Sequence, residues 1–451
     1  MLNSSLPRPS RGGLPLHVKV LLGFVLGALL GLAAHFYAAD APLTHDAVAY
    51  VTRPLGQIFL NLLFMLVIPL MFSALVLGVA ELGDIASLGR LGWKTLTYTA
   101  AVTGMAVAIG LVMVNLIQPG LHLDPALAQQ AMANNAGKAV EIVTSGHKLD
   151  AMQLLVNIVP KNVFAAAVDE KQTLGIVFFA LMVGIGLVLT PSPATAAFKH
   201  AVQGLFEVSM RLIGLFILLA PYAVACFMFT LCAQLGWDVI VGLGWFVVTV
   251  VLALGVHMFV VLPLWVKFMG GMPIRTFFRG SQEATLTAFA TASSTATLPV
   301  TLRVAEENLM LPRKVSRFVL TVGASANHHG TALFEGVTVL FLAQVFGLHL
   351  PLLEQLMVLA LCILGGIGTA GIPSGSLPVI AMICGIIGIR PEGIAIIIGV
   401  NTFLDMCRTA LNVTGDLATA VVVSHRSGEV DIPAAALQHV ELERADAQQD
   451  L

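Results

Sequence analysis

The stretch from Asp405 to Asp416 reads Asp-Met-Cys-Arg-Thr-Ala-Leu-Asn-Val-Thr-Gly-Asp and lies in an otherwise apolar segment. Its polar residues recur every three or four positions, at Asp405, Arg408, Thr409, Asn412 and Asp416. A helix with this spacing carries all of them on one face. A charged side chain at the bilayer centre costs roughly 2.5–3.5 kcal/mol, so such residues usually face a cavity and serve function. The stretch therefore predicts a polar site within a membrane helix.

The composition of the whole chain is that of a membrane protein. Of its 451 residues, 57% are hydrophobic and 11% are charged, and the mean hydropathy is +0.91. Soluble domains carry about 25% charged residues, so lipid must solvate most of this chain. This excludes a soluble enzyme, a secreted domain and a disordered chain. A formal net charge of −2 also gives no electrostatic basis for binding nucleic acid.

Six apolar stretches have the character of ordinary membrane helices. They are His17–Tyr37, Leu55–Val79, Leu96–Ile117, Gly175–Leu189, Leu205–Ala233 and Val239–Phe268. Basic residues around the start of the first stretch also fit a signal peptide. Because further spans follow, we expect an uncleaved helix with its basic end in the cytoplasm. The polar insert Gly120–Asp150 is too hydrophilic to cross, and we expect a loop at one membrane surface.

The cysteines, the adjacent histidines and the C-terminal segment do not indicate a disulfide framework, a metal site or a functional motif. The five cysteines lie in apolar stretches and form no Cys-x-x-Cys pair, which argues against a disulfide framework and a zinc site. The adjacent His328 and His329 lack the i, i+4 spacing of a helical metal motif. Acidic, basic and amide residues alternate from Ser424 to Leu451, so we expect a solvated tail.

The part from Phe277 to Ser424 differs, because its apolar runs are interrupted at their centres. Ser293-Ser294-Thr295 divides one pair of runs, and a Gly- and Pro-rich stretch from Gly365 to Ser376 divides another. An arm of about ten residues spans only half a bilayer, at about 1.5 Å per residue. Two such segments are typical of a transporter site between inverted repeats, where open backbone lines a cavity. Kinked helices and a turn facing solvent are the alternatives.

A third polar centre lies between these two interruptions. Gly323, Asn327, Thr331 and Glu335 recur every four residues. A polar centre that contains Gly predicts local unwinding, with backbone carbonyls turned toward an ion.

The charges near Asp405 indicate a class of ligand. Arg408 can grip a carboxylate through two parallel hydrogen bonds, and Asp405 can accept an ammonium group. With Asn412 as a further donor, these residues favour an acidic amino acid. The alternative is an internal ion pair between Asp405 and Arg408, which would leave Asp416 without a cation.

Four motifs occur in a characteristic order. They are Thr297-Leu-Pro-Val-Thr301, Asn327-x-x-Gly-Thr-Ala-Leu333, Gly368-Thr-Ala-Gly-Ile-Pro373 and the stretch from Asp405 to Asp416. Together they closely resemble the glutamate transporter family, the dicarboxylate/amino acid:cation symporters. The resemblance covers nearly the whole chain in its hydropathy and is specific from Ala288 to Asp416.

The resemblance implies an all-α polytopic membrane protein with eight transmembrane helices, two re-entrant helical hairpins and inverted repeats. The hairpins would be about Arg279–Leu311 and Leu353–Ile389, and the second would close over substrate as a gate. A homotrimer is implied, in which a transport domain moves like an elevator against a static scaffold. The implied boundaries are 1-92 for scaffold helices 1 and 2, 93-118 for transport-domain helix 3, 119-235 for scaffold helices 4 and 5 with the polar loop, 236-424 for the transport-domain core (helix 6, hairpin 1, helix 7, hairpin 2, helix 8), and 425-451 for a cytoplasmic tail.

The resemblance also implies which residues bind substrate and cations. Arg408 matches the position for the substrate side-chain carboxylate, and Asp405 the position for its amino group. Further substrate contacts match Thr409, Asn412, Thr331, Ser294 and the backbone near Ile372. One sodium site matches Asp416, Asn412, Asn327 and the Gly323 carbonyl, and another matches Ser325 with second-hairpin carbonyls at Gly366, Ile367 and Thr369. Such hard oxygen ligands suit an alkali cation.

The sequence departs from the family pattern at several positions. His329 stands where an acidic residue ligates a third sodium, and Thr99-Ala-Ala-Val-Thr103 stands where the family supplies hydroxyls to that ion. Ala292 stands where some prokaryotic members have Arg, and Asn401 replaces an acidic residue. Glu335 matches a glutamate proposed to carry a proton, and histidine can also titrate near neutral pH. We expect fewer coupled sodium ions and a proton on Glu335 or His329; the alternative is a hydrogen-bonded filler role for His329.

The leading prediction is a secondary active symporter, not an enzyme, that couples Na⁺ or H⁺ to uptake of glutamate or aspartate. A C4-dicarboxylate such as succinate, malate or fumarate is the alternative substrate, but it offers no amino group to Asp405. An intramembrane enzyme would need a paired nucleophile and base, and no motif pairs Ser293 or Ser294 with a histidine. A channel is the third alternative. We expect a multi-pass protein of a bacterial inner membrane, with both termini in the cytoplasm.

Overall fold

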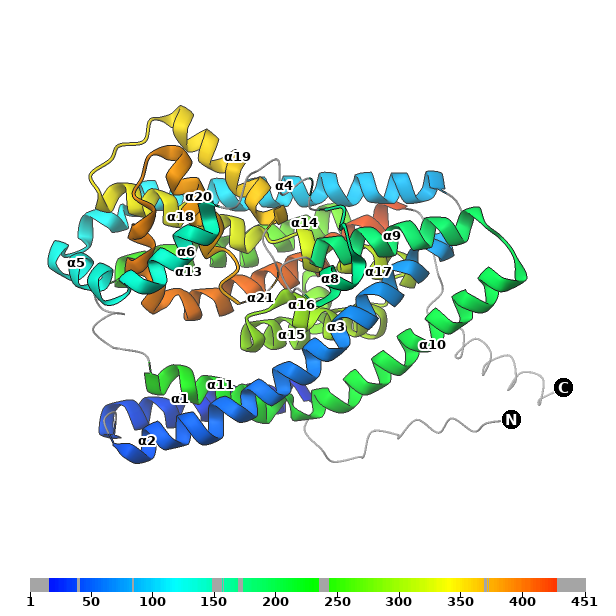
Figure 1. Cartoon of the computed structure of the whole chain (residues 1–451), viewed down its shortest axis with the longest axis horizontal. Coiled ribbons are helices and arrows are strands. Elements are labelled where there is room, and N and C mark those ends of the chain that lie inside the picture. The colour runs from blue at the N-terminus through cyan, green and yellow to red at the C-terminus, as the bar shows by residue number, and fades with distance from the viewer. Residues whose placement is uncertain are drawn as a thin grey trace.

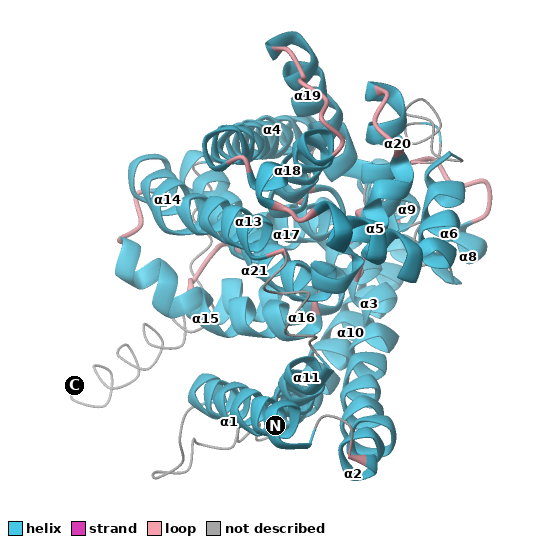
Figure 2. Cartoon of the chain, turned by 90° about the vertical axis from the view of Figure 1, so that its left-hand side faces the viewer, coloured by secondary structure: helices cyan, strands magenta, loops and turns pink. Residues whose placement is uncertain are grey.

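The chain is almost entirely helical. The computed structural model describes residues 16–38, 41–82, 85–147, 156, 158–168, 173–234, 243–368, 371 and 373–427, and no strand occurs among them (Figure 2). Within this part, six helical runs are long and apolar enough to cross a membrane. The prediction of an all-α membrane protein is confirmed at this level.

The helices follow one another with short connections (Figure 1). The first half comprises α1 (Leu16–Ala38), α2 (Pro42–Asp46), η1 (Ala47–Thr52), α3 (Arg53–Leu82), α4 (Ile85–Ile117), η2 (Pro119–His122), α5 (Pro125–Asn134), α6 (Ala136–His147), α8 (Val163–Val168), α9 (Thr173–Leu189), α10 (Pro193–Phe216), η4 (Ile217–Leu219) and α11 (Ala220–Gln234). The second half comprises α13 (Gly244–Val256), η5 (His257–Val261), α14 (Leu262–Gly270), α15 (Ile274–Thr291), α16 (Ser294–Arg303), η6 (Val304–Asn308), α17 (Arg313–Ala326), α18 (His329–Val345), α19 (Leu352–Gly368), α20 (Leu377–Ile387), η7 (Pro391–Gly393) and α21 (Ile394–Ser427).

Five of the six long apolar runs coincide with predicted spans, and the sixth, Pro391–Arg426, contains the polar stretch. The predicted span Gly175–Leu189 forms the shorter helix α9. The predicted span Leu205–Ala233 begins too far along the chain, because α10 starts at Pro193. Ser192 and Thr195 form a capping box there, and Pro193 occupies the first turn. A cap and a favourable first residue start a helix before its apolar part begins.

The polar insert Gly120–Asp150 is not a loop over its described residues, which end at His147. It contains the helices α5 and α6. Asp124 caps α5, since its Oδ1 accepts the Ala126 N–H at 2.8 Å. The loop prediction was wrong because polarity shows only that a segment does not cross, whereas Ala- and Gln-rich sequences form helices well. α6 packs against α20, and α5 packs against α21.

Helix packing gathers the polar centres in one place. α1 lies along α11, and α3 contacts α9, α10 and α11. α18 packs against α4, α19 and α21, while α14, α15 and α17 also contact α21. α21 is thus surrounded by other helices (Figure 2). Of the most apolar 18-residue stretch in the run Pro391–Arg426, 72% is buried.

The three predicted interruptions are present. α15 and α16 form a first hairpin that turns at Ala292, whose φ of 49° is left-handed, and a Glu283–Arg303 ion pair joins its arms. α17 and α18 are separated by the non-helical residues Asn327 and His328. α19 and α20 form a second hairpin, with Ser374 at a φ of 61° between them. The hairpins lie close to the predicted bounds, although the first begins at Ile274.

Candidate functional site

The polar face of α21 points into the protein. Asp405, Arg408, Thr409, Asn412 and Asp416 are each no more than 4% exposed. The neighbours of α21 on this side include α15, α17 and α18. The sequence prediction of one polar helical face is confirmed, and its burial means that every polar atom on it needs a partner.

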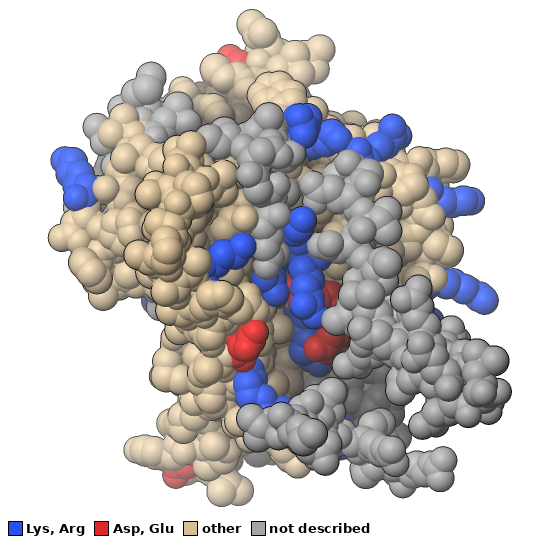
Figure 3. Space-filling view, turned by 90° about the vertical axis from the view of Figure 1, so that its right-hand side faces the viewer, with Lys and Arg blue, Asp and Glu red and all other residues tan. Residues whose placement is uncertain are grey.

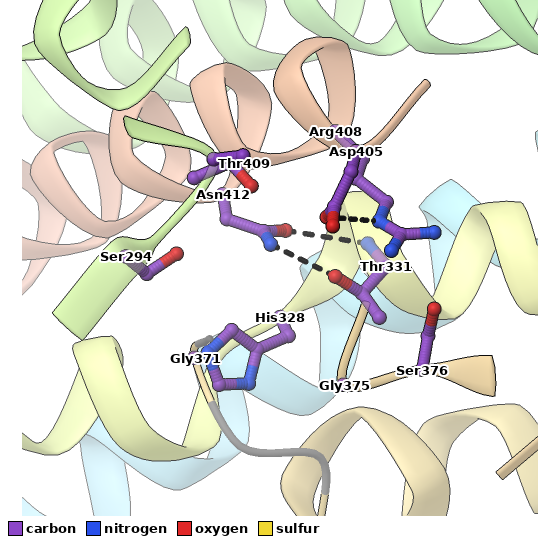
Figure 4. A pocket seen from close by; sticks show the side chains of 11 residues that line it. Ser294, His328, Thr331, Gly371, Gly375, Ser376, Asp405, Arg408, Thr409 and Asn412 are labelled. Atoms are coloured by element: carbon purple, nitrogen blue, oxygen red, sulfur yellow. Dashed lines mark hydrogen bonds and ion pairs between the residues drawn. The ribbon is translucent and has the colours of Figure 1, made fainter. Parts of the chain in front are cut away.

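A small pocket lies beside this face, where four segments meet (Figure 4). Its side chains nearly fill it, because only about 10 Å³ is open to the centre of a water molecule, which is room for about one water. Its lining comes from the first hairpin turn, the α17–α18 break, the segment before α20, and α21: Ala292, Ser294, His328, Thr331, Gly371, Gly375, Ser376, Asp405, Arg408, Thr409 and Asn412. Of the predicted substrate contacts, all line this pocket except Ile372, which lies outside the described residues.

Arg408 and Asp405 form the charged side of the pocket. Arg408 Nε donates to Asp405 Oδ1 at 2.8 Å, so the internal ion pair considered above is present. The Arg408 guanidinium also lies 4.3 Å from the centre of the Phe334 ring. Because the ion pair uses Nε, the terminal guanidinium nitrogens keep N–H groups that can bind a carboxylate.

Asp405 also links α21 to the second hairpin. Its Oδ2 accepts the Ser374 backbone N–H at 2.5 Å. Asn401 Nδ2 donates to Ser374 Oγ at 2.9 Å, so two side chains of α21 hold the same residue of the hairpin. The sequence placed Ser374 in the Gly- and Pro-rich interruption but did not predict this contact, because its partners come from a distant helix.

Asn412 joins α21 to the start of α18. Its Oδ1 accepts the Gly330 N–H at 2.7 Å. It also accepts the Thr331 N–H at 3.4 Å, and its Nδ2 donates to Thr331 Oγ1 at 3.0 Å (Figure 4). Both ends of the amide are therefore occupied. This places Asn412 and Thr331, two of the predicted substrate contacts, side by side at the pocket.

A second polar cluster lies next to the α17–α18 break and is made by Asp416, Asn327 and Gly323. Asn327 Nδ2 donates to Asp416 Oδ1 at 2.7 Å, and a Cβ on Gly323 would lie 2.6 Å from that same oxygen. Among the described residues, Asp416 has no ion-pair partner and Asn327 Oδ1 has no hydrogen bond. A buried carboxylate beside an unpartnered amide oxygen fits a hard cation. Asn412, the fourth predicted ligand, turns its amide to Gly330 and Thr331 instead.

The second predicted cation site is only partly described. Thr369 and the side chain of Ile367 lie outside the described residues. Ser325 Oγ is buried without a partner in the described part of the chain. The Gly366 carbonyl, however, contacts His328 Nδ1 at 3.1 Å.

His329 packs against a second histidine that sequence reasoning missed. The rings of His329 and His257 are 5.2 Å apart and both residues are fully buried. Neither ring makes a hydrogen bond of good geometry to a described residue, although His329 approaches the backbone of Asn412. A Cβ at Gly415 would lie 1.7 Å from His329 Nε2, so only glycine leaves room for this ring. A lone histidine in an apolar span was the available signal for His257.

Glu335 lies fully buried on α18 and reaches the second hairpin. A Cβ added to Gly365 of α19 would lie 2.9 Å from Glu335 Oε2. Both predicted proton carriers are therefore inside the helical core, but neither lines the pocket.

Comparison with known proteins places this site in a family. The sodium:dicarboxylate symporter family matches residues 16–426. A proton/sodium-glutamate symport protein of Geobacillus stearothermophilus is 30% identical over 414 residues, covering 91% of this chain and 94% of the relative. A proton/glutamate-aspartate symporter of Escherichia coli (strain K12) is 30% identical over 90% of this chain and 91% of its own length. Excitatory amino acid transporter 2 of Rattus norvegicus is 31% identical, with coverages of 90% and 77%. The chain belongs to the sodium:dicarboxylate symporter family.

Proposed function

We propose that this protein is a cation-coupled symporter that takes up glutamate or aspartate across a membrane. The observation that carries the proposal is the buried Arg408–Asp405 ion pair, which lines a small pocket between the two hairpins and α21. Relatives named as glutamate symporters, at about 30% identity, support the same substrate class. The function needs no chemical step, only binding and movement.

The proposed substrate binds to both members of the Arg408–Asp405 ion pair. Its side-chain carboxylate binds the terminal N–H groups of Arg408, and its ammonium group binds Asp405. Thr409, Asn412, Thr331, Ser294 and the backbone near Ile372 complete the contacts. A C4-dicarboxylate is the second candidate, because it satisfies Arg408 equally well, but it has no donor for the buried Asp405 carboxylate.

The proposed architecture has eight membrane helices and two re-entrant hairpins with inverted repeats. α16 has 10 residues and α20 has 11, so neither spans a bilayer core of about 30 Å at about 1.5 Å per residue. The proposed division is into scaffold (1-92 and 119-235) and transport domain (93-118 and 236-424). The contacts of α1 with α11, and of α3 with α9, α10 and α11, support it, whereas α5 and α6 of the polar insert pack on α21 and α20 across the proposed boundary. An elevator movement within a homotrimer follows from the resemblance.

The proposed location is the inner membrane of a bacterium, with both termini in the cytoplasm. Among the charged side chains of the described surface at one end of the molecule, Lys and Arg outnumber Asp and Glu, although acidic groups lie among the basic ones near the centre (Figure 3). Basic residues concentrate on the cytoplasmic side of membrane proteins. We therefore assign this end to the cytoplasm.

Coupling is proposed to use sodium at Asp416, Asn327 and Gly323. Asn412, the fourth predicted ligand, would have to turn its amide away from Gly330 and Thr331 to reach the ion. His329, in place of an acidic residue, supports coupling to fewer sodium ions. A proton carried by Glu335 or His329 would supply the rest of the driving force. The predicted second sodium site at Ser325 and the second-hairpin carbonyls is left out of this proposal, because His328 Nδ1 already contacts the Gly366 carbonyl.

Thermal unfolding of the purified protein tests the substrate. L-aspartate, L-glutamate and succinate are each added in sodium and in potassium buffer. A ligand at 100 times its Kd stabilises the folded state by about 2.7 kcal/mol. The proposal predicts stabilisation by an acidic amino acid that requires sodium. Stabilisation by succinate alone would instead identify a dicarboxylate carrier.

A further inference from the structure

His328 occupies the meeting point of the two hairpins and the α17–α18 break. The residue is non-helical, only 2% exposed, and lines the pocket (Figure 4). Its Nδ1 contacts the Gly366 carbonyl of α19 at 3.1 Å, and its Nε2 contacts the Ala324 carbonyl of α17 at 3.2 Å. The imidazole thus lies between backbone oxygens of two elements that are far apart in sequence, and in its neutral form its single N–H donates to one of them at a time.

The tips of the two hairpins touch next to this ring. The Gly371 carbonyl accepts Ser293 Oγ–H at 2.6 Å and the Thr295 N–H at 3.2 Å. A Cβ on Gly371 would lie 3.1 Å from His328 Nε2 and 2.7 Å from the Ala324 carbonyl. The ring is therefore packed between the second hairpin and the break, with no room for a larger residue at Gly371.

This arrangement disagrees with a second sodium site at Ser325, Gly366, Ile367 and Thr369. A sodium ion there would need the Gly366 carbonyl, which already contacts the His328 ring. Carbonyl oxygens suit hard cations, whereas imidazole nitrogen suits transition metals. The ring supplies an N–H donor where a cation would otherwise draw the same oxygens together.

We propose that His328 replaces a sodium ion at this position and holds the second hairpin closed over the pocket without one. In this respect His328 is a positioning residue, because it acts on the hairpin through Gly366. The inference rests on the proposed function for the role of the hairpin as a gate. The bridge itself does not depend on which solute is carried.

Replacing His328 by a small residue has two consequences. The hairpin loses its link to the break, and the space left by the ring is bordered by the carbonyl oxygens of Gly366 and Ala324. Ser325 follows Ala324 in the sequence, and its buried Oγ has no hydrogen-bond partner in the described part of the chain. Such an oxygen-lined space can take an alkali cation. Loss of the ring should therefore make hairpin closure dependent on sodium.

Hydrogen exchange of the purified full-length protein, without any added solute, tests this directly. Amides of α20 and its N-terminal flank are compared in sodium and in potassium buffer. An Asp416→Asn background weakens sodium binding at the other predicted site, and the sodium concentration is kept below the raised midpoint of that site. With His328 present, exchange should be the same in both buffers. In His328→Ala, exchange in potassium should be about tenfold faster, the effect of losing one hydrogen bond, and sodium should restore protection.

Two further variants keep the test decisive. His328→Gln retains an N–H donor and should stay close to the parent, which also answers the question if His328→Ala does not fold. His257→Ala removes another buried imidazole and should leave α20 unchanged. Sodium-dependent exchange in the protein that retains His328, or unchanged exchange in His328→Ala, would overturn the proposal. Failure of every amino acid to bind would sink the proposed function, while leaving these exchange results interpretable.

Discussion

Arg408 and Asp405 determine which solute fits the pocket. Asp405 is held by Arg408 Nε and by the Ser374 N–H, so its carboxylate is buried with both partners already in place. A buried charge is tolerated only while its hydrogen bonds are satisfied. An amino acid supplies an ammonium group to Asp405 as well as a carboxylate to Arg408, whereas a dicarboxylate supplies only the carboxylate.

Asp405→Ser should therefore discriminate between the two candidate substrates. A hydrogen bond to a charged group contributes about 1.5–3 kcal/mol, so affinity for L-aspartate or L-glutamate should fall by about 10- to 100-fold. Affinity for succinate should change much less. Isothermal titration measures the affinities for the amino acids and for succinate. Glu141→Gln, at an exposed residue of α6, is the control for loss of one carboxylate. Equal losses for both classes would remove Asp405 from its assigned role.

Asp416→Asn should weaken sodium binding while keeping the shape of the site. The new amide can still accept from Asn327, but its charge is gone. The sodium concentration that half-saturates the amino-acid-induced stabilisation should rise by about tenfold or more, since a charged partner contributes about 1.5–3 kcal/mol. Glu141→Gln again serves as the control. An unchanged sodium midpoint would show that no coupled ion binds at Asp416.

At the scale of elements, the interrupted helices were predictable and the helices of the polar insert were not. Gly, Pro and hydroxylic residues inside an apolar run are a local signal, so the breaks at Ser293 and Asn327 followed from the sequence. α5 and α6 were missed because low hydropathy does not distinguish a helix from a loop. Ser374 and His257 could not be assigned roles, because their partners Asp405 and His329 come from other helices.

Ser293 serves both hairpins and provides a test at this scale. Its Oγ accepts the Ala296 N–H at 3.1 Å, which caps α16, and donates to the Gly371 carbonyl at 2.6 Å. Ser293→Ala should destabilise the contact between the hairpin tips by about 0.5–2 kcal/mol, the usual cost of losing a cap. Hydrogen exchange at residues 294–298 should accelerate accordingly. Ser192→Ala removes the cap of α10 and is the matched control; equal exchange at the tips in both variants would argue against a linking role for Ser293.

At the scale of the molecule, Arg317 lies at the contact between the proposed scaffold and the proposed transport domain. It lies on α17, in the proposed transport domain, and its guanidinium is 4.2 Å from the Phe206 ring centre on α10. A Cβ on Gly78 of α3 would lie 3.5 Å from Arg317 Cβ. Both α3 and α10 belong to the proposed scaffold, so an elevator movement must break this contact.

Phe206→Leu should therefore shift the balance between positions of the transport domain. The change keeps an apolar side chain but removes the aromatic face, which contributes about 0.5–2 kcal/mol to a cation–π contact. Distances between spin labels on α10 and α17 should show a larger population in which the transport domain has moved away from the Arg317–Phe206 contact. Phe198→Leu, at a half-exposed phenylalanine of the same helix, is the control. Identical distance distributions in the parent and Phe206→Leu would contradict a movement at this interface.

Uptake into proteoliposomes tests the central claim most directly. Labelled L-glutamate and L-aspartate are offered to vesicles that contain the purified protein, with an inward sodium gradient, an inward proton gradient, both, or neither. We predict concentrative uptake that requires a cation gradient and is abolished by Arg408→Ala. No uptake of either amino acid under any gradient, while succinate is accumulated under the same conditions, would contradict acidic amino acid symport.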